Sequence, residues 1–190
     1  MKLKELDDAE VRQVYRTHLT QDFPAAERKP LRAIRSLRRR GLYDCYAMTQ
    51  GETVLSYAFF CQRGDWCLLD YFAVCAPFRG KGTGTRMMEA LRFLLPHMGI
   101  LAEVEDPGQA ATPGEKHTRL RRIAFYERLG FLMTGIRVRL FSVDYRIMAW
   151  RTEYSSPSDG ELYDVLAGLY QAMMGEHTGP FLRMSLDGAE

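Results

Sequence analysis

Residues 68–86 read LLDYFAVCAPFRGKGTGTR, an apolar run followed by a glycine-rich entry into a helix. The apolar run is typical of a central strand that is covered on both faces. At such a turn several backbone N–H groups point the same way, at the positive end of the helix dipole. Glycines at 80, 82 and 84 would allow a phosphate to approach closely. The stretch predicts an anion cradle, and the alternative is a tight turn with a structural role alone.

Two familiar phosphate-binding motifs do not match this turn. A P-loop requires GxxxxGK followed by Ser or Thr, and that spacing is missing. A dinucleotide fingerprint would need its third glycine where Thr85 or Met87 stands. Glu103 and Glu105 do follow the turn by about 20 residues, as the ribose-binding acid of that fold does. Dinucleotide binding therefore stays open as an alternative.

Length and composition are those of one globular domain of 190 residues, with 46% hydrophobic and 26% charged residues. A net charge of +2 does not indicate a nucleic-acid or a membrane partner. The N-terminus lacks the apolar core of a signal peptide, and no run approaches the roughly 20 apolar residues of a membrane span. We expect a cytoplasmic protein.

The cysteines and histidines do not predict a metal site. No CxxC pair occurs, and the four histidines are scattered without ligand spacing. The cysteines stand inside strand-like apolar runs, so we expect reduced thiols in the core. They are Cys45, Cys61, Cys67 and Cys75.

Hydrophobic periodicity predicts a mixed order of helices and strands. The predicted strands cover residues 2–6, 42–48, 53–61, 66–75, 100–104, 131–141 and 145–150. The predicted helices cover residues 7–20, 30–40, 82–95 and 115–129. The second of these helices carries a strongly basic face, formed by Arg28, Lys29, Arg32, Arg35, Arg38, Arg39 and Arg40.

The tail after residue 152 predicts one further helix. Ser158 and Glu161 form a capping box, and an apolar face follows at Leu162, Val165, Leu166, Leu169 and Met173. We expect a main domain over residues 1–152 and a helical extension over 153–190. The apolar face must pack on this domain or on a second copy of the chain, so a homodimer is an alternative.

Two motifs resemble those of one enzyme family. Arg79, Gly82 and Gly84 stand in the pattern Arg-x-x-Gly-x-Gly, which resembles motif A of the GNAT superfamily of N-acetyltransferases. Residues 123–131, IAFYERLGF, resemble its motif B. The resemblance covers roughly residues 1–151 and implies an α/β (α+β) fold. Its mixed, mainly antiparallel sheet would have about six or seven strands, with a splay between the fourth and fifth and helices on both faces.

The resemblance implies acetyl-CoA as cofactor and no metal. The strand before the turn would hold the pantetheine arm, and the turn would hold the pyrophosphate. The implied residues are Phe72, Ala73, Val74, Arg79, Gly80, Lys81, Gly82, Thr83, Gly84 and Thr85.

The resemblance also implies a catalytic acid, Tyr126, whose alternative is a tyrosine packed in the core. For the base we rank Glu103 first, followed by Glu105 and Asp70, and base action through water is a further option. Asp70 is equally compatible with a structural, hydrogen-bonding role, since it is the one charge in an apolar strand. Cys75 has no histidine near it in sequence, so direct transfer is preferred to an acyl-cysteine mechanism.

The expected acceptor is a primary amine on a small molecule or a peptide. The resemblance implies that residues 23–40 and the region of Arg137, Arg139 and Tyr145 frame it. The basic helix is either a solvated face or a surface that attracts an acidic acceptor, a nucleic acid or the ribose phosphate of the coenzyme. A different class of function, a coenzyme- or RNA-binding module without catalysis, is the alternative.

Overall fold

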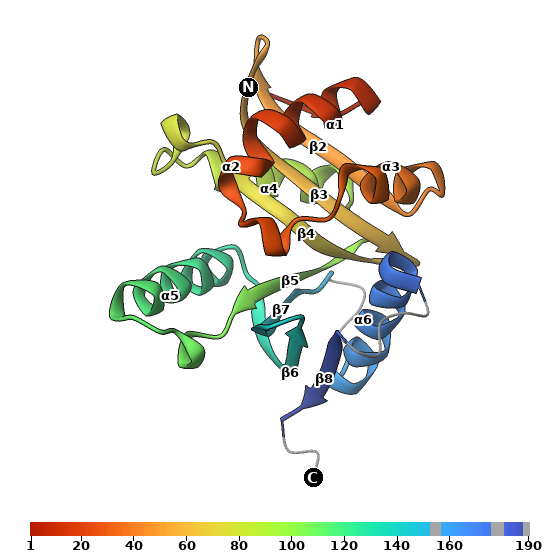
Figure 1. The fold of residues 1–190 in the computed structure, drawn as a ribbon, viewed down its shortest axis with the longest axis vertical. Helices are drawn as coiled ribbons and strands as arrows, with labels where there is room; N and C mark the ends of the chain where they lie inside the picture. The colour runs from red at the N-terminus through yellow and green to blue at the C-terminus, as the bar shows by residue number, and fades with distance from the viewer. Residues whose placement is uncertain (153–156, 176–180, 188–190) are drawn as a thin grey trace. The chain divides into compact units, whose positions relative to one another are not determined.

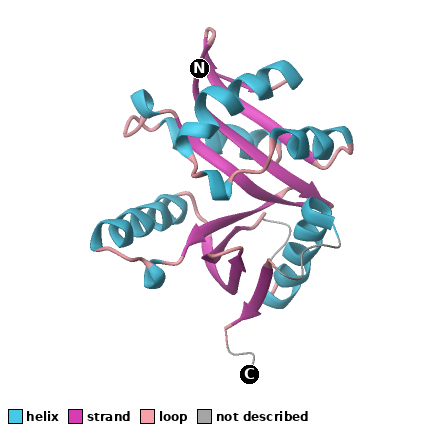
Figure 2. Cartoon of the chain, viewed as in Figure 1, coloured by secondary structure: helices cyan, strands magenta, loops and turns pink. Residues whose placement is uncertain are grey.

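The computed structural model describes residues 1–152, 157–175 and 181–187. The chain divides into two compact units. Unit 1 holds residues 1–62 and 69–96, and unit 2 holds residues 63–68 together with the described part of 97–190. Each unit combines strands with helices, as Figure 2 shows.

Unit 1 is built on four strands that neighbour one another in chain order. They are β1 (Lys2–Glu5), β2 (Tyr43–Gln50), β3 (Thr53–Arg63) and β4 (Trp66–Val74). β1 pairs antiparallel with β2, and β2 pairs antiparallel with β3 across the turn at Gly51. The hairpin predicted between residues 42 and 61 is confirmed.

Helices cover both faces of the unit 1 strands (Figure 1). α1 (Asp8–Val14) starts with a capping box between Asp7 and Glu10 and continues through a π-helical turn into α2 (Thr20–Asp22). α3 (Leu31–Arg39) follows, and Gly41 at φ 68° ends it. α4 (Thr83–Leu94) lies on the face of the strands opposite to these three helices.

Unit 2 contains strands in the order β5-β7-β6-β8, all paired antiparallel. Their bounds are Gly99–Glu105 for β5, Leu132–Leu140 for β6, Val143–Trp150 for β7 and Leu182–Leu186 for β8. α5 (Pro113–Arg128) is capped by Thr112, and α6 (Asp159–Met174) has the predicted capping box of Ser158 and Glu161. α6 packs against β6 and β8 of the same unit, with Leu162, Leu166, Leu169 and Tyr170 buried.

The predicted α/β fold class is confirmed, with one strand more than the six or seven expected. The extra strand is β8, in the tail for which the sequence predicted a helix alone. The predicted splay between the fourth and fifth strands falls where the chain passes from unit 1 to unit 2, and it stays a prediction. The predicted boundary at residue 152 likewise stays a prediction, while β8 extends the strands of unit 2 beyond it.

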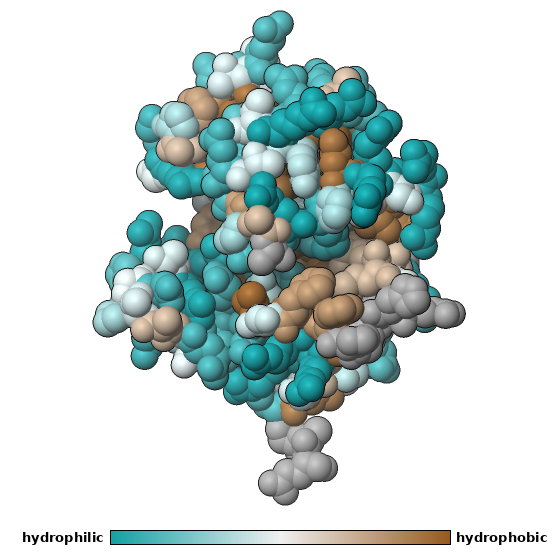
Figure 3. Space-filling view, viewed as in Figure 1, coloured by the Kyte–Doolittle hydropathy of each residue, from teal (hydrophilic) through white to brown (hydrophobic). Residues whose placement is uncertain are grey.

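Each unit has its own buried core. In unit 1 the strands contribute Tyr57 and Phe59, and the helices contribute Val11, Ile34 and Met87. In unit 2 the core includes Leu101, Ile136, Ile147 and Leu166. Burial of these apolar groups is the main favourable term in folding. On the face that Figure 3 draws, hydrophilic side chains predominate and hydrophobic ones gather in smaller areas.

Candidate active site

The glycine-rich turn connects β4 to α4 in unit 1. Gly80 and Gly82 both have φ 73°, and a Cβ built on either would meet nothing within 4 Å. The backbone conformation therefore requires glycine, while the space above the turn is open. Gly82 is the N-cap of α4, and as a glycine it has no side chain to cap the amides of the helix's first turn. These features fit an oxyanion held by backbone N–H groups.

The polar side chains of the turn bond to the protein itself. Arg79 donates to Val74 O (2.9 Å) and to the Asp22 carboxylate (2.7 Å). Lys81 donates to Pro77 O (3.0 Å), and Thr83 Oγ1 donates to Phe78 O (3.2 Å). These bonds brace the turn, so its backbone amides carry most of the anion-binding capacity.

The end of β4 leads directly into this turn. Phe72, Ala73 and Val74 are half-buried, and the next residue, Cys75, donates its N–H to Leu55 O of β3 (2.9 Å). β4 is thus fixed to β3 up to its last residue. The segment predicted to hold a pantetheine arm therefore has a rigid backbone.

Asp70 lies in β4 and has two polar partners. Lys29 Nζ stands 2.6 Å from Oδ1, and the Tyr43 hydroxyl donates to Oδ2. The Asp70 side chain is only 7% exposed. Burial, and then the Asp70 charge, raise the pKa of Tyr43 well above its ordinary value, so this hydroxyl keeps its proton. The contacts favour the structural role of Asp70, and its role as a base stays a prediction.

The other two carboxylates belong to β5 in unit 2. Glu103 accepts a hydrogen bond from the Tyr170 hydroxyl of α6. Glu105 instead forms ion pairs with Arg122 (2.8 Å) and Arg119 (3.7 Å) of α5. The roles of Glu103 and Glu105 as the base stay predictions.

Tyr126 is near the end of α5, also in unit 2. It is 5% exposed, and its ring packs edge-on against Phe125 (5.2 Å) and Phe131 (5.1 Å). Burial raises the pKa of Tyr126 to about 12. The side chain is therefore both a core residue and a hydroxyl that holds its proton at neutral pH, and its role as an acid stays a prediction.

Cys75 has a histidine beside it that the sequence did not suggest. His18, from the π-helical turn Tyr15–Leu19, lies with Nδ1 3.5 Å from Cys75 Sγ. Burial, and less strongly Asp22, raise the pKa of the Cys75 thiol to about 11. The nucleophile of an acyl-cysteine mechanism is a thiolate, which this environment disfavours. All four cysteines are buried, and none forms a disulfide.

Residues 41–132 match the family model of the acetyltransferase (GNAT) domain. The chain carries a GNAT acetyltransferase domain. The matched range contains the glycine-rich turn and the three carboxylates Asp70, Glu103 and Glu105, as well as Tyr126. This domain places the chain among the acyltransferases.

Solved structures with the GNAT fold resemble most of the chain. A protein from Bacteroides thetaiotaomicron assigned to the GNAT acetyltransferases has a TM-score of 0.74 at 19% identity, covering 92% of this chain and 99% of its own. The ribosomal-protein-S18-alanine N-acetyltransferase from Escherichia coli has a TM-score of 0.62 at 21% identity, covering 82% and 96%. A Salmonella typhimurium protein assigned as an acetyltransferase, solved with acetyl-CoA, has a TM-score of 0.56 at 16% identity, covering 82% and 96%. These likenesses establish the GNAT fold. A comparison with curated proteins found no match.

Several polar residues of the GNAT domain and its surroundings were missed from the sequence. Asp22 accepts from Arg79 and from the Tyr57 hydroxyl (3.0 Å), and Tyr170 donates to Glu103. The chain separates the partners in the first and last of these pairs by 57 and 67 residues. No local sequence pattern could therefore have joined them.

The basic face near α3 is largely occupied by ion pairs and hydrogen bonds. Arg35 and Arg38 both contact Asp8, at 3.4 and 2.5 Å, and Arg38 also donates to Leu6 O. Lys29 is engaged by Asp70. Asp8 and Asp70, from distant parts of the chain, thus neutralise part of the positive charge that has few acidic neighbours in the sequence. These contacts favour a structural role for the basic face.

Among residues 1–152, 157–175 and 181–187, no group of three or more His, Cys, Asp or Glu side chains is arranged to hold a metal ion. Within those same ranges, no helix has both the length and the apolar character that crossing a membrane requires.

Proposed function

We propose that the protein is an N-acetyltransferase that moves an acetyl group from acetyl-CoA to a primary amine in a single ternary complex. The observation that carries the proposal is the domain match over residues 41–132, because it spans the anion cradle and the candidate acid and base. The Salmonella typhimurium structure, solved with acetyl-CoA, supports the choice of cofactor.

The residues of unit 1 fit the cofactor. The open space over Gly80 and Gly82 and the first turn of α4, which no side chain caps, suit a pyrophosphate. The backbone of Phe72, Ala73 and Val74 would bind the pantetheine amides. When bound, acetyl-CoA supplies the acetyl group as a thioester, which is activated for attack by an amine.

Glu103 and Tyr126 would handle the protons of the reaction. Glu103 accepts the proton that the amine nitrogen loses as it bonds to the carbonyl carbon. Tyr126 donates a proton to the sulfur as the carbon–sulfur bond breaks, so the charges balance. The raised pKa of Tyr126 keeps that proton in place until it is needed.

The acceptor is a small molecule or a peptide with a primary amine. The name of the Escherichia coli relative indicates that it acetylates an alanine of ribosomal protein S18, so peptide amines are included among the acceptors to test. Because Asp8 and Asp70 pair with the basic residues near α3, these residues give no support to an RNA-binding module.

A screen of amine acceptors with the full chain, read out as released thiol, tests this function. We expect Tyr126→Phe and Glu103→Gln to lower kcat by about 100-fold or more, while the thermal shift caused by acetyl-CoA stays unchanged. Tyr163→Phe, which removes a part-buried hydroxyl of α6 that donates to Met184 O, is the matched control. If acetyl-CoA produces no thermal shift and no acceptor releases thiol, the proposal is wrong.

A further inference from the structure

Unit 2 has a surface cavity in the region of Arg137, Arg139 and Tyr145 that is expected to frame the acceptor, and it contains none of the residues proposed for cofactor binding or catalysis. Its volume is about 420 Å³, and Arg137, Arg139, Arg183 and Asp144 are among the side chains that line it. A second cavity of about 250 Å³ shares Arg139 and Arg183, and its remaining lining is Phe141 and Phe181. We refer to Arg139, Arg183, Phe141 and Phe181 as the arginine–aromatic pocket. The volume of the larger cavity suits a small molecule.

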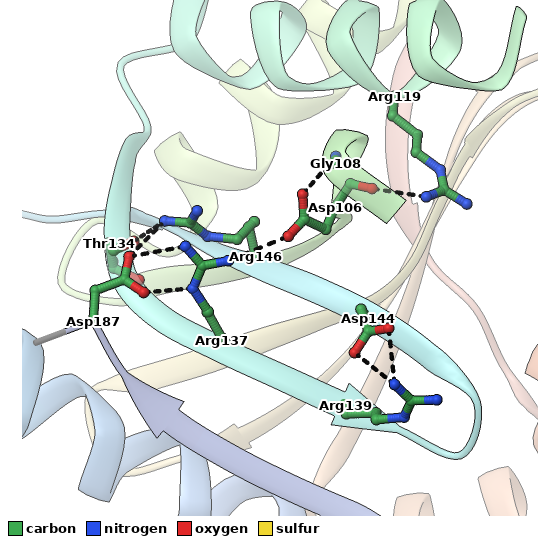
Figure 4. A network of polar contacts seen from close by, with 9 residues as sticks. All are labelled: Asp106, Gly108, Arg119, Thr134, Arg137, Arg139, Asp144, Arg146 and Asp187. Carbon is green, nitrogen blue, oxygen red and sulfur yellow. Dashed lines mark hydrogen bonds and ion pairs between the residues drawn. The ribbon is translucent and has the colours of Figure 1, made fainter. Parts of the chain in front are cut away.

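The positive charge of this region is only partly compensated. Figure 4 shows Arg137 and Arg146 converging on Asp187, whereas Arg139 pairs with Asp144 (3.2 Å). Arg183 forms no ion pair within the described ranges and stands directly opposite Arg139 in the pairing of β6 with β8. Like charges at directly opposed strand positions repel each other. A bound oxyanion would remove that repulsion, and guanidinium groups bind carboxylates and phosphates with paired hydrogen bonds.

The aromatic side of the pocket is held in an unusual conformation. Phe141, in the turn between β6 and β7, has φ 53°, which is a strained value for a bulky residue. Its N–H donates to Phe181 O (2.7 Å), and the two ring centroids are 5.4 Å apart. Both rings are about half exposed, at 56% and 50%. Because Leu140 pairs with Val143, Phe141 is the first residue of a two-residue hairpin loop, in which φ > 0 is usual, and this turn fixes the position of its ring.

We propose that the arginine–aromatic pocket binds a small aromatic carboxylate or phosphate. Its oxyanion would lie between Arg139 and Arg183, and its ring would pack on Phe141 and Phe181. The neighbouring carboxylates of Asp106 and Asp144 repel an extended polyanion, which favours a small ligand over a nucleic acid. The inference does not depend on acetyl transfer.

Amide NMR titrations of the full chain test the pocket directly. The probes are phenyl phosphate and phenylacetate, each compared with its anion without a ring, inorganic phosphate or acetate. We expect saturable shifts at Phe141, Phe181 and Arg183, with the ring-bearing probes binding about three- to tenfold more tightly. The stronger of the two ring-bearing probes identifies the preferred oxyanion. Shifts at Gly80–Gly84 instead would report anion binding at the cofactor turn.

Three variants separate the parts of the pocket. Arg183→Ala should weaken all four anions by about tenfold, and Phe181→Ala should weaken the ring-bearing probes alone. Arg121→Ala, which removes an exposed charge from α5 in the same unit, should have no effect. Shifts that stay linear to about 20 mM, or equal losses in Arg183→Ala and Arg121→Ala, would overturn the proposal. No acetyl-CoA is present, so failure here leaves the acetyltransferase proposal untouched.

Discussion

At the scale of single residues, the Tyr170 hydroxyl connects the C-terminal helix α6 to the proposed base. It donates to Glu103, and the tyrosine is 1% exposed. We predict that Tyr170→Phe lowers kcat by about tenfold, because the Glu103 carboxylate loses the group that orients it. The KM for acetyl-CoA should not change, since Tyr170 is not among the residues proposed to bind the coenzyme.

Tyr163→Phe is the control for this prediction. Tyr163 stands on the same helix, but its hydroxyl donates to Met184 O (3.3 Å) and contacts no candidate base. Each substitution removes one hydroxyl, so both should lower the free energy of unfolding by about 1 kcal/mol. Equal kcat values for the two variants would show that Tyr170 has a structural role alone.

At the residue scale, a short motif was enough to predict the backbone conformation of the glycine-rich turn. The glycines at 80 and 82 adopt the conformation that the motif requires, because the turn itself imposes it. The partners of Asp70 could not be predicted, since Lys29 and Tyr43 lie 41 and 27 residues away in the chain. For the same reason, the contact between His18 and Cys75 could not be inferred.

At the scale of elements, the turn before α4 depends on backbone conformation more than on space. A methyl group on Gly82 would meet no atom within 4 Å, yet φ 73° disfavours any side chain. We predict that Gly82→Ala lowers the free energy of unfolding by about 1–2 kcal/mol and weakens acetyl-CoA binding. Urea unfolding and isothermal titration measure the two effects.

Gly114→Ala is the matched control, because Gly114 lies in α5 and a Cβ there would make only an ordinary contact with Thr112. Alanine favours the helix over glycine by up to about 1 kcal/mol, so this variant should be neutral or slightly more stable. If Gly82→Ala behaves in the same way, the left-handed conformation at the turn is incorrect.

The elements with clear end signals were the ones that the sequence predicted well. The capping boxes at Asp7 and Ser158 mark the starts of α1 and α6. β8 was missed although Leu182, Met184 and Leu186 alternate with polar residues over a length that a strand can have. The π-helical turn after α1 left no recognisable pattern, since its residues also fit an α-helix.

At the scale of the whole molecule, the division into units does not follow the chain. Residues 63–68 belong with the C-terminal half, although they are continuous with strands β3 and β4 of unit 1. Domain boundaries usually fall in exposed, polar linkers. The polar turn at residues 62–65 marks one end of this segment, but the other end, between Leu68 and Leu69, lies inside strand β4. The GNAT motifs predicted the order of the helices and strands along the chain. The two units instead depend on contacts between segments that are distant in the sequence.

Both units bury thiol and tyrosine groups whose pKa values are raised by burial. Burial raises the pKa of Cys61 and Cys75 to about 11, and that of Tyr126 to about 12. Unfolding returns these groups toward ordinary values of 9.0 for the thiols and 10.0 for tyrosine. The unfolded chain therefore releases protons that the folded chain keeps. Stability is complete below about pH 9 and falls as the pH rises toward the folded values.

We predict that Cys75→Ala flattens this fall between pH 9 and 11, by about 1.4 kcal/mol for each pH unit at most. Urea unfolding at pH 8, 9, 10 and 11 gives the slope, which a cavity left by the lost sulfur does not alter. Ile34→Val, which removes one buried methyl group in the same unit, should lower the free energy of unfolding by about 1 kcal/mol at every pH. Its dependence of stability on pH should match that of the unmodified chain. An unchanged slope in Cys75→Ala would mean that folding does not raise the pKa of this thiol. The cysteine beside His18 would then be a candidate nucleophile, and the direct transfer of the acetyl group would have to be reconsidered.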